Sequence, residues 1–385
     1  MRIPILLAAV ITTAFTPLFS EEPIARKEQN VSVRNEVQLA IDKGLAWLKS
    51  HQNPDGSWSS PEHPALTALP LIAFYREPGG RFREAKPEFL QKGYGFLRSN
   101  AKPDGGIYGK GLANYNTSVA LMAMLTTGAS EDESLIRRAR DFIVAQQATN
   151  MPNPDVNGGI GYGATGVSPK RQHPDLDNTV VALEALRAFR SARPTVEIAA
   201  KDDLNWSAAI DFISRTQNLP THNPKASDDP ANRGGFVYYP GFSNADPSDL
   251  SPDAKRPLRS YGSMSYAGLL SFIYADLKPG DPRLDAALDW LKKNYSLEEN
   301  PGLQRAGLFY YYHLMAKGLA AARVETMETA DGRKVDWARE LALKLIDLQN
   351  SDGSWVNDTA RWMEKDPALV TSYCILALET IFHRL

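Results

Sequence analysis

The chain repeats one short pattern near both of its ends. The pattern is a glutamine, three residues, a glycine, one residue and a tryptophan. It is formed by Gln52, Gly56 and Trp58, and again by Gln349, Gly353 and Trp355. More degenerate copies lie between, at 96–109, 142–163, 212–239 and 290–312, which makes six units. Because repeated units pack mainly against their neighbours, this repetition limits the fold to a stack or a ring of similar parts.

Each unit predicts two helices joined by a turn. The first helix is amphipathic: between residues 37 and 48, apolar residues recur every three or four positions. A Pro-Asp-Gly or Gly-Gly sequence then predicts a helix end, because glycine tolerates positive φ. The second helix is rich in alanine and leucine, which predicts burial on several sides. The second helices are 67–74, 117–124, 179–186, 265–272, 312–319 and 371–378. Sustained apolar/polar alternation is absent from the sequence, so the predicted fold class is all-α.

The composition excludes several classes of protein. There are 43 basic and 45 acidic residues, so the net charge is −2 and the basic excess typical of nucleic-acid-binding proteins is missing. The single cysteine, Cys374, excludes an internal disulfide framework. The histidines and acids lack the spacing of a metal site. We therefore expect no metal, no cofactor and no nucleic-acid partner.

The first twenty residues predict a secretory signal peptide. Arg2 precedes an apolar run over residues 3–15, which is shorter than the roughly 20 residues of a membrane-spanning helix. An uncleaved N-terminal anchor is the alternative. Residues 21–35 are polar and predict a flexible lead-in to a folded domain over 36–385. We expect an exported protein, periplasmic or secreted, whose mature chain has no transmembrane span.

A long insertion is predicted in the fourth unit, over residues 218–259. It is rich in proline, asparagine, aspartate and serine. Loops of this length inside a compact domain are uncommon and are often functional, although long surface insertions cost little stability. The insertion therefore predicts either a lid or binding surface at one mouth of the fold, or a surface loop with no role.

The repeats resemble those of a known family. The units at 52–58 and 349–355 are similar to the Gln–Trp motifs of squalene and oxidosqualene cyclases. The number of hairpins resembles their toroidal domain and the β subunit of protein prenyltransferases. This resemblance covers residues 36–385 and implies a closed α/α toroid of six helical hairpins, in which the second helices line a central cavity. We expect the glutamine to bind the start of a neighbouring backbone segment and the tryptophan to pack on it.

The start of the second helix in the third unit carries the residues that could perform chemistry. Pro174, Asp175, Asp177 and Thr179 resemble the Pro-Asp-x-Asp-Asp-Thr segment of class II terpene cyclases. The resemblance implies that Asp177 is the acid that protonates an alkene, with Asp175 beside it in the catalytic segment. Asn178 replaces the last acid of the family, which changes the hydrogen-bond donors around Asp177. The role requires a neutral carboxyl group in a dry cavity, where burial raises its pKa.

Aromatic residues near the starts of the second helices predict the wall of the cavity, because π faces attract carbocations. The expected cavity residues are Tyr115, Asn178, Tyr261, Tyr266, Tyr310, Tyr311 and Tyr373. When the six units are aligned, the position of Asp177 is occupied elsewhere by Ala65, Tyr115, Ser263, Tyr310 and Leu369. A carboxylate therefore occurs there in the third unit alone, which indicates a local role. The alternative is an exposed aspartate that is stabilised by the helix dipole.

Three functions remain open from the sequence. The first is a terpene-cyclase-like protein, an isomerase or mutase if active, that acts on or holds an apolar isoprenoid-type ligand. The second is a non-enzymatic toroid that binds partners through its cavity or rim loops. The third is a polysaccharide-acting enzyme, which would need paired carboxylates across the cavity. The cyclase hypothesis has two difficulties: class II cyclases carry a second helical domain for which this chain is too short, and their substrates are made inside the cell.

Overall fold

The computed structural model describes residues 30–84, 86–163, 172–251 and 254–385. The expected signal peptide at 1–20 and most of the expected lead-in lie outside these residues. Helix α2 (Val31–Ser50) begins inside the expected lead-in, so the predicted domain start at residue 36 is too late. The reason is that Val33 is buried and extends the apolar stripe of α2 toward its start. Within the described ranges, no helix is long and apolar enough to cross a membrane.

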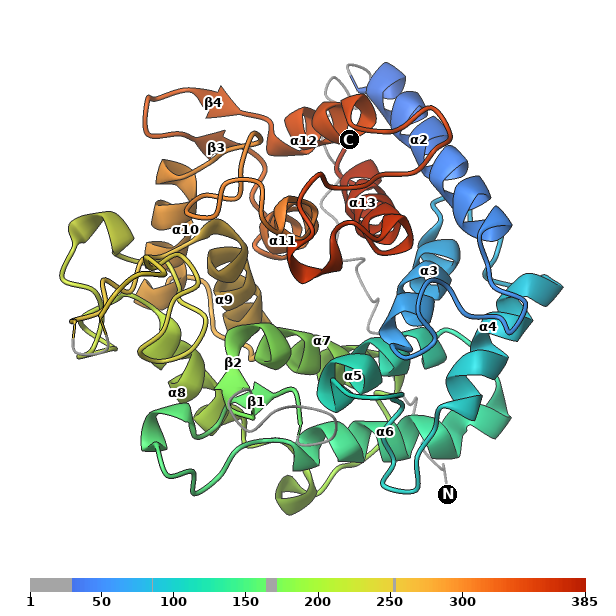
Figure 1. The fold of residues 1–385 in the computed structure, drawn as a ribbon, viewed down its shortest axis with the longest axis horizontal. Helices are drawn as coiled ribbons and strands as arrows, with labels where there is room; N and C mark the ends of the chain where they lie inside the picture. The colour runs from blue at the N-terminus through green and yellow to red at the C-terminus, as the bar shows by residue number, and fades with distance from the viewer. Residues whose placement is uncertain (1–29, 85, 164–171, 252–253) are drawn as a thin grey trace, which may run out of the picture.

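Two kinds of helix alternate along the described residues. The amphipathic helices are α2, α4 (Glu88–Ser99), α6 (Glu133–Ala145), α8 (Trp206–Thr216), α10 (Pro282–Lys293) and α12 (Trp337–Asp347). The more apolar helices are α3 (Ala65–Arg76), α5 (Ala113–Met124), α7 (Leu176–Ala192), α9 (Gly262–Tyr274), α11 (Leu308–Ala321) and α13 (Pro367–Phe382). Figure 1 shows the first set on the outside and the second set around the centre.

Strands are few and short in the described part of the chain. Strand β1 (Ile160–Gly161) pairs with β2 (Pro174–Asp175), and β3 (Met327–Glu328) pairs with β4 (Lys334–Val335), both in antiparallel register. The prediction of a mostly helical protein is therefore confirmed. The pairing of β1 with β2 matters for the site, because it fixes the residue that precedes helix α7.

The inner helices contact one another in chain order. Each of α3, α5, α7, α9, α11 and α13 packs against the next, and α13 also packs against α3. In the same way, α12 and α13 both contact α2. The last unit therefore lies beside the first, as Figure 1 shows.

In four of the six units, a glutamine of the repeat connects an outer helix to the following one. Gln52 Nε2 donates a hydrogen bond of 2.8 Å to the carbonyl oxygen of Phe89, at the start of α4. Gln349 Nε2 donates one of 2.9 Å to the carbonyl oxygen of Ala40, in the middle of α2. Gln147 and Gln217 make the equivalent bonds to Asn205 and Arg283. The expected structural role is confirmed, although Gln349 binds the interior of a helix and not its start.

The tryptophan and glycine of the repeat pack the same junction. Trp58 is fully buried, and its indole N–H donates to the carbonyl oxygen of Leu48 at 2.7 Å. Gly353 has a φ of +95°, and a Cβ atom placed on it would lie 2.6 Å from the carbonyl oxygen of Lys43 in α2. The equivalent glycines, each against a carbonyl of the following outer helix, are Gly56, Gly105, Gly158 and Gly234. Glycine is required here both by the backbone angle and by the close approach.

Candidate functional site

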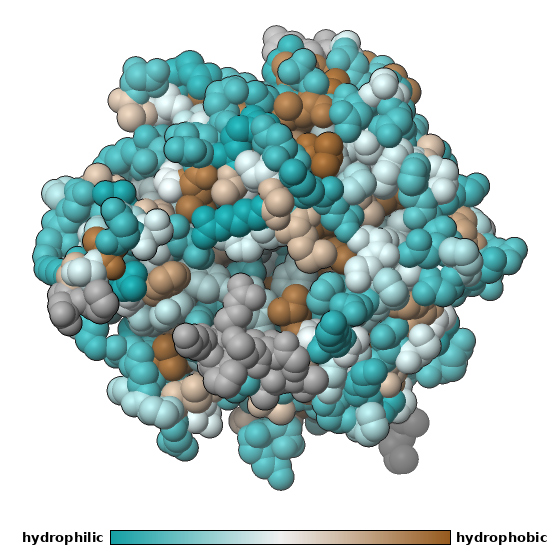
Figure 2. Space-filling model, viewed as in Figure 1, coloured by the Kyte–Doolittle hydropathy of each residue, from teal (hydrophilic) through white to brown (hydrophobic). Residues whose placement is uncertain are grey.

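A cavity of about 460 Å³ lies at one end of the ring of inner helices. Its wall includes one residue from the first turn of each inner helix, at the position that the repeat alignment makes equivalent to Asp177. These residues are Ala65, Tyr115, Asp177, Ser263, Tyr310 and Leu369. Because all six inner helices begin at this cavity, they all run in the same direction, away from it. Figure 2 shows that this face of the molecule is hollowed near its centre.

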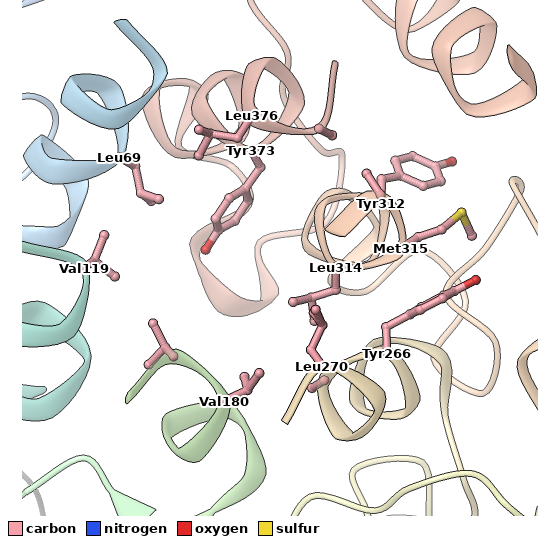
Figure 3. Packing of buried hydrophobic residues seen from close by; sticks show 14 of the residues in the cluster. Leu69, Val119, Val180, Tyr266, Leu270, Tyr312, Leu314, Met315, Tyr373 and Leu376 are labelled. Atoms are coloured by element: carbon pink, nitrogen blue, oxygen red, sulfur yellow. The ribbon is translucent and has the colours of Figure 1, made fainter. Parts of the chain in front are cut away.

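Tyrosines make up much of the cavity wall. Four of the six tyrosines that the sequence predicted there line it: Tyr115, Tyr261, Tyr310 and Tyr373. Tyr266 and Tyr311 do not. Their rings pack against each other with centroids 5.6 Å apart, on the sides of α9 and α11 that face away from the cavity. Figure 3 shows Tyr266 pointing away from the centre of the ring. The prediction is wrong for these two residues because neighbours on a helix are rotated by about 100°.

Asp177 lies on the cavity wall in the first turn of α7. Its Oδ1 atom accepts a hydrogen bond of 2.5 Å from the hydroxyl of Tyr310, on α11 across the ring. Burial raises the pKa of Asp177, and the hydrogen bond from Tyr310 acts in the opposite direction. Among the described residues that line the cavity, Asp177 is the only carboxylate. The lining therefore lacks the pair of carboxylates that a polysaccharide-acting enzyme would need.

Asp175 lies behind the wall and is fully buried. As the N-cap of α7, its Oδ1 accepts the backbone N–H of Asn178 at 2.8 Å. The Asn178 side-chain amide donates to both carboxyl oxygens, at 3.1 and 2.9 Å. Burial raises the pKa of Asp175 to about 8, and the nearby Asp177 contributes in the same direction. The hydrogen bonds from Asn178 act in the opposite direction.

Asn178 does not line the cavity, contrary to the prediction. It is fully buried and turns toward Asp175 and α5, where Asn114 Nδ2 donates to its backbone carbonyl oxygen at 3.2 Å. Asn178 follows Asp177 directly, and one step along a helix rotates the side-chain direction by about 100°. When Asp177 faces the cavity, the side chain of Asn178 therefore points into the packed interior. Its side-chain amide binds Asp175. The hydrogen bond to Asp177 comes from Tyr310.

The threonine of the same segment is structural. Thr179 Oγ1 accepts the backbone N–H of Ile160 in β1 at 3.0 Å, and its own hydroxyl donates to the carbonyl oxygen of Asp175 at 2.7 Å. The equivalent side chains in other units accept a backbone N–H in the same way; they are Thr67, Thr117, Ser265 and Thr371. Because the contact recurs around the ring, it belongs to the fold and not to the chemistry of one unit.

Loops complete the wall at the mouth of the cavity. One of them is the insertion for which the sequence left open a lid or binding surface at a mouth, but the individual wall residues were not predicted. Asn244 comes from the insertion at 218–259, and Trp362 comes from the 3-10 turn η6 (Arg361–Met363) before α13. The Arg361 guanidinium lies 4.1 Å from the centroid of the Trp362 ring and donates to Asn244 Oδ1 at 3.2 Å. Glu364 anchors this turn, since its buried carboxylate accepts the backbone N–H of Tyr310 at 2.7 Å. Tyr162, Tyr238 and Met363 also line the cavity without having been predicted.

A second, smaller cavity of about 60 Å³ lies further along the inner helices. Tyr115, Tyr310 and Tyr373 line both cavities. Elsewhere its wall is mostly apolar, apart from His313, Arg76 and an ion pair in which Lys317 Nζ lies 2.5 Å from a Glu184 carboxylate oxygen. In the part of the chain that the structure describes, no group of three histidine, cysteine or acidic side chains is arranged to hold a metal ion.

Comparison with known proteins finds similarity in sequence and in fold. No family model matches the chain. A squalene–hopene cyclase from Bradyrhizobium diazoefficiens is 26% identical over 206 residues, which cover 46% of this chain and 29% of that protein. The chain thus spans less than a third of the length of this curated relative.

Solved structures match over most of the chain. The type II terpene cyclase MstE from Scytonema has a TM-score of 0.55 and 17% identity, covering 91% of this chain and 99% of its own. A variant of MstE in complex with its substrate, geranylgeranyl dihydroxybenzoate, matches with a TM-score of 0.55 and 15% identity, over 92% and 99% of the two chains. A GH76 α-mannanase from Bacteroides thetaiotaomicron has a TM-score of 0.54 and 12% identity, over 89% and 95%.

At these identities the structural matches show the fold alone. A similar fold occurs in a terpene cyclase and in a mannanase, so the fold does not choose between their reactions. The Gln–Trp repeats, the helical architecture and the sequence match to a squalene–hopene cyclase point the same way. Together they confirm that this chain resembles the terpene-cyclase-like superfamily.

Proposed function

We propose that this chain is a terpene-cyclase-like enzyme that protonates an isoprenoid alkene inside its ring, with Asp177 as the acid. One observation carries the proposal: Asp177 lies on the wall of a cavity lined by tyrosines and apolar side chains, and Tyr310 donates to it at 2.5 Å. A carboxyl group with a raised pKa, opposite a fixed hydroxyl donor, has the two properties that alkene protonation needs.

The reaction is an isomerisation with a balanced proton count. Asp177 gives its proton to one carbon of a terminal double bond, forming a C–H bond and a carbocation on the more substituted carbon. The next double bond attacks that cation to close a ring. The cyclised cation then loses a proton to water, and water returns a proton to the Asp177 carboxylate. The Tyr310 hydroxyl stabilises the carboxylate left on Asp177. The faces of Tyr115, Tyr261 and Tyr373 stabilise the cation without acting as strong bases.

Asp175 and Asn178 support this acid from behind the wall. Burial favours the neutral form of Asp175, which would place no second negative charge beside Asp177. Asn178 holds Asp175 with three hydrogen bonds. The replacement of the family acid by Asn178 is therefore compatible with the chemistry, since its amide serves Asp175 and not the alkene.

We propose an isoprenoid as the substrate class. Two relatives support it: one is named squalene–hopene cyclase, and the other was solved with geranylgeranyl dihydroxybenzoate. We further propose that the contacts from α13 to α3 close the six hairpins into a toroid, and that residues 1–20 direct export to the periplasm or the exterior.

Product analysis tests the proposed reaction. Purified wild-type protein, Asp177→Asn and the control Asp285→Asn are incubated with squalene and with C15 and C20 prenyl substrates, and extracts are analysed by gas chromatography with mass spectrometry. Asp285 is exposed on outer helix α10, so its variant controls for loss of one surface carboxylate. We expect a cyclic product from the wild type and from Asp285→Asn that is absent with Asp177→Asn. Equal product from all three would refute Asp177 as the acid. No product from any folded variant would favour the non-enzymatic binding protein.

A further inference from the structure

The first turns of three inner helices are held by side chains of the following unit. Each donor is the backbone N–H of the residue that the repeat alignment makes equivalent to Asp177, and each acceptor is a side-chain oxygen. An N–H group in the first turn has no acceptor within its own helix, so the contact replaces water there. The three pairs are Ala65 with Asn116 at 2.9 Å, Ser263 with Asn300 at 2.9 Å, and Tyr310 with Glu364 at 2.7 Å.

The acceptor that holds α11 differs from the other two in charge. Asn116 and Asn300 supply a neutral amide oxygen, whereas Glu364 supplies a fully buried carboxyl group. Burying a charge costs more free energy than burying an amide, so the repeat itself does not require an acid at this position. Glu364 also binds Asn357, whose Nδ2 donates to Oε2 at 2.5 Å. Both of these partners are donors, which matches the ionised form of Glu364.

The surroundings of Glu364 act on its proton in two directions. Burial raises the pKa of its carboxyl group. The hydrogen bonds from Asn357 and from the backbone N–H groups at the start of α11 lower it. Because these N–H groups lie at the positive end of the helix, they favour a negative charge on Glu364. The acid is therefore held by the first turn of α11 and holds that turn in return.

Glu364 belongs to a strained turn at the mouth of the cavity. We call residues 361–364 the mouth turn; Figure 1 shows this segment just before α13 and beside α11. Trp362 and Met363 both have left-handed backbone angles, with φ of 54° and 65°. Such angles are unfavourable for residues other than glycine and persist only where the surroundings hold them. Trp362 lines the cavity and is also 42% exposed, so it lies between the cavity and solvent.

Two contacts attach the mouth turn to the start of α11. The ring of Trp362 packs over Gly307, the N-cap of α11, where an added Cβ atom would lie 3.0 Å from the ring. Two residues further along the chain, the Glu364 carboxyl group accepts the N–H of Tyr310. A shift of the mouth turn therefore removes the contacts that fix the first turn of α11.

Tyr310 connects this first turn to the acid. Its backbone N–H is bound by Glu364, and its hydroxyl donates to Asp177 Oδ1 at 2.5 Å across the ring. A hydrogen bond between two oxygens is effective up to a separation of about 3.0 Å. A displacement of the Tyr310 hydroxyl by about 0.5–1 Å away from Asp177 is therefore enough to break the bond.

We infer that Glu364 is a positioning residue, which couples the placement of the mouth turn to the hydrogen bond between Tyr310 and Asp177. With the turn in place, Glu364 fixes the start of α11 and the Tyr310 hydroxyl reaches Asp177. When the turn moves away, that bond is lost. The inference rests on the proposed function for the role of Asp177 as the acid. It adds a residue outside the cavity wall and a link between the mouth and the acid.

Fluorine NMR tests the coupling without requiring a reaction. 3-Fluorotyrosine is placed at position 310 of the purified protein, and its signal is compared in the wild type, Glu364→Ala, Glu364→Gln and Asp177→Ala. The Asp177→Ala protein gives the reference shift for a lost acceptor. We expect Glu364→Ala to move the signal at least half of the way to this reference. Glu364→Gln keeps an oxygen for the Tyr310 N–H but turns an amide donor toward Asn357, so it should move the signal less, in the same direction.

Glu379 provides the matched control. It is also a fully buried acid of the last unit, and its Oε2 atom lies 3.7 Å from Arg76 Nε, away from the cavity wall. Glu379→Ala and Glu379→Gln remove a buried carboxyl group and should leave the signal of residue 310 unchanged. A wild-type signal in the folded Glu364 variants would overturn the inference. Where Glu364→Ala folds poorly by circular dichroism, the same criterion applies to Glu364→Gln alone.

Kinetics separate positioning from ligand binding. Because Glu364 acts through Tyr310, Glu364→Ala should lower kcat by no more than Tyr310→Phe does and change KM less than about twofold. Combined with Tyr310→Phe, it should lower kcat no further. Multiplied effects in the double variant would show that Glu364 acts independently of Tyr310, which would overturn the inference. A wild type that forms no product but gives the expected fluorine shifts would count against the proposed function and still support the coupling.

Discussion

Replacing Gly353 by alanine tests whether the contact between the last and the first unit stabilises the protein. Gly353 has a φ of +95°, and its added Cβ would lie 2.6 Å from the Lys43 carbonyl oxygen in α2. The carbonyl is backbone and cannot rotate away as a side chain would. The variant must therefore either distort its own turn or push α2 outward.

The cost has a backbone part and a contact part, and the contact part combines a hydrogen bond and packing. A left-handed backbone angle costs alanine roughly 1–2 kcal/mol. Relieving the short contact moves α2 and stretches the bond from Gln349 to Ala40, at 2.9 Å, which is worth about 1 kcal/mol. Lost packing around the junction adds about 1 kcal/mol more. We expect Gly353→Ala to lower the free energy of unfolding by about 3–4 kcal/mol.

Gly280 provides the matched control. Its φ is +87°, but a Cβ atom added there meets nothing within 4 Å. Gly280→Ala should therefore cost only the backbone part, about 1–2 kcal/mol. Unfolding in guanidinium chloride measures both costs, and hydrogen exchange over residues 31–50 reports on α2. Equal costs for the two variants, with unchanged protection of α2, would refute the proposal that this junction closes the six hairpins into a toroid.

Three further predictions concern the site and its surroundings. Tyr310→Phe removes the hydrogen-bond donor to Asp177. Because a hydrogen bond to a charged group contributes about 1.5–3 kcal/mol, product formation should slow by ten- to a hundredfold. An unchanged rate would exclude Tyr310 from the proposed reaction. The pKa of Asp175 is about 8 in the folded chain and about 4 when unfolded. Between pH 4 and pH 8 the folded state therefore binds more protons than the unfolded state, so the free energy of unfolding should fall as pH rises through this range. Denaturant midpoints at pH 5 and pH 8 should differ less for Asp175→Asn than for the wild type, and an equal difference would contradict the assignment. Cys374 is buried and its thiol pKa is raised well above the usual range; a thiol reagent should react with it only as fast as the protein unfolds, whereas rapid labelling of the native protein would show that α13 opens locally.

The repeat allowed much of the helical framework and part of the site to be predicted from sequence. Aligning the units placed one residue of each at the position of Asp177, and all six of these residues line the same cavity. This worked because an equivalent position in an equivalent helix has the same orientation relative to the ring axis. Asn178 and Tyr311 were misplaced by a single residue each, since one step along a helix turns a side chain by about 100°.

The mouth of the cavity could not be predicted in this way. Asn244 and Trp362 reach the wall from loops, where neither a helical nor a strand period relates sequence position to orientation. Their place depends on contacts far apart in the sequence, such as that of Glu364 with the backbone of Tyr310. Glu364 lies three residues before Pro367, the first residue of α13. Nothing in the sequence around it indicates that its carboxylate binds α11 of the preceding unit.

The common direction of the inner helices has an electrical consequence. Each helix carries a partial positive charge at its start and a partial negative charge at its end. Six parallel helices that begin at one cavity therefore set up a potential that falls along the axis of the ring. The positive end near Asp177 favours the ionised form of that carboxyl group, and in the proposed reaction a positive charge formed there would be drawn toward the far end of the helices. For the proposed reaction, the architecture would thus separate the two charges that proton transfer creates, before any single side chain is considered.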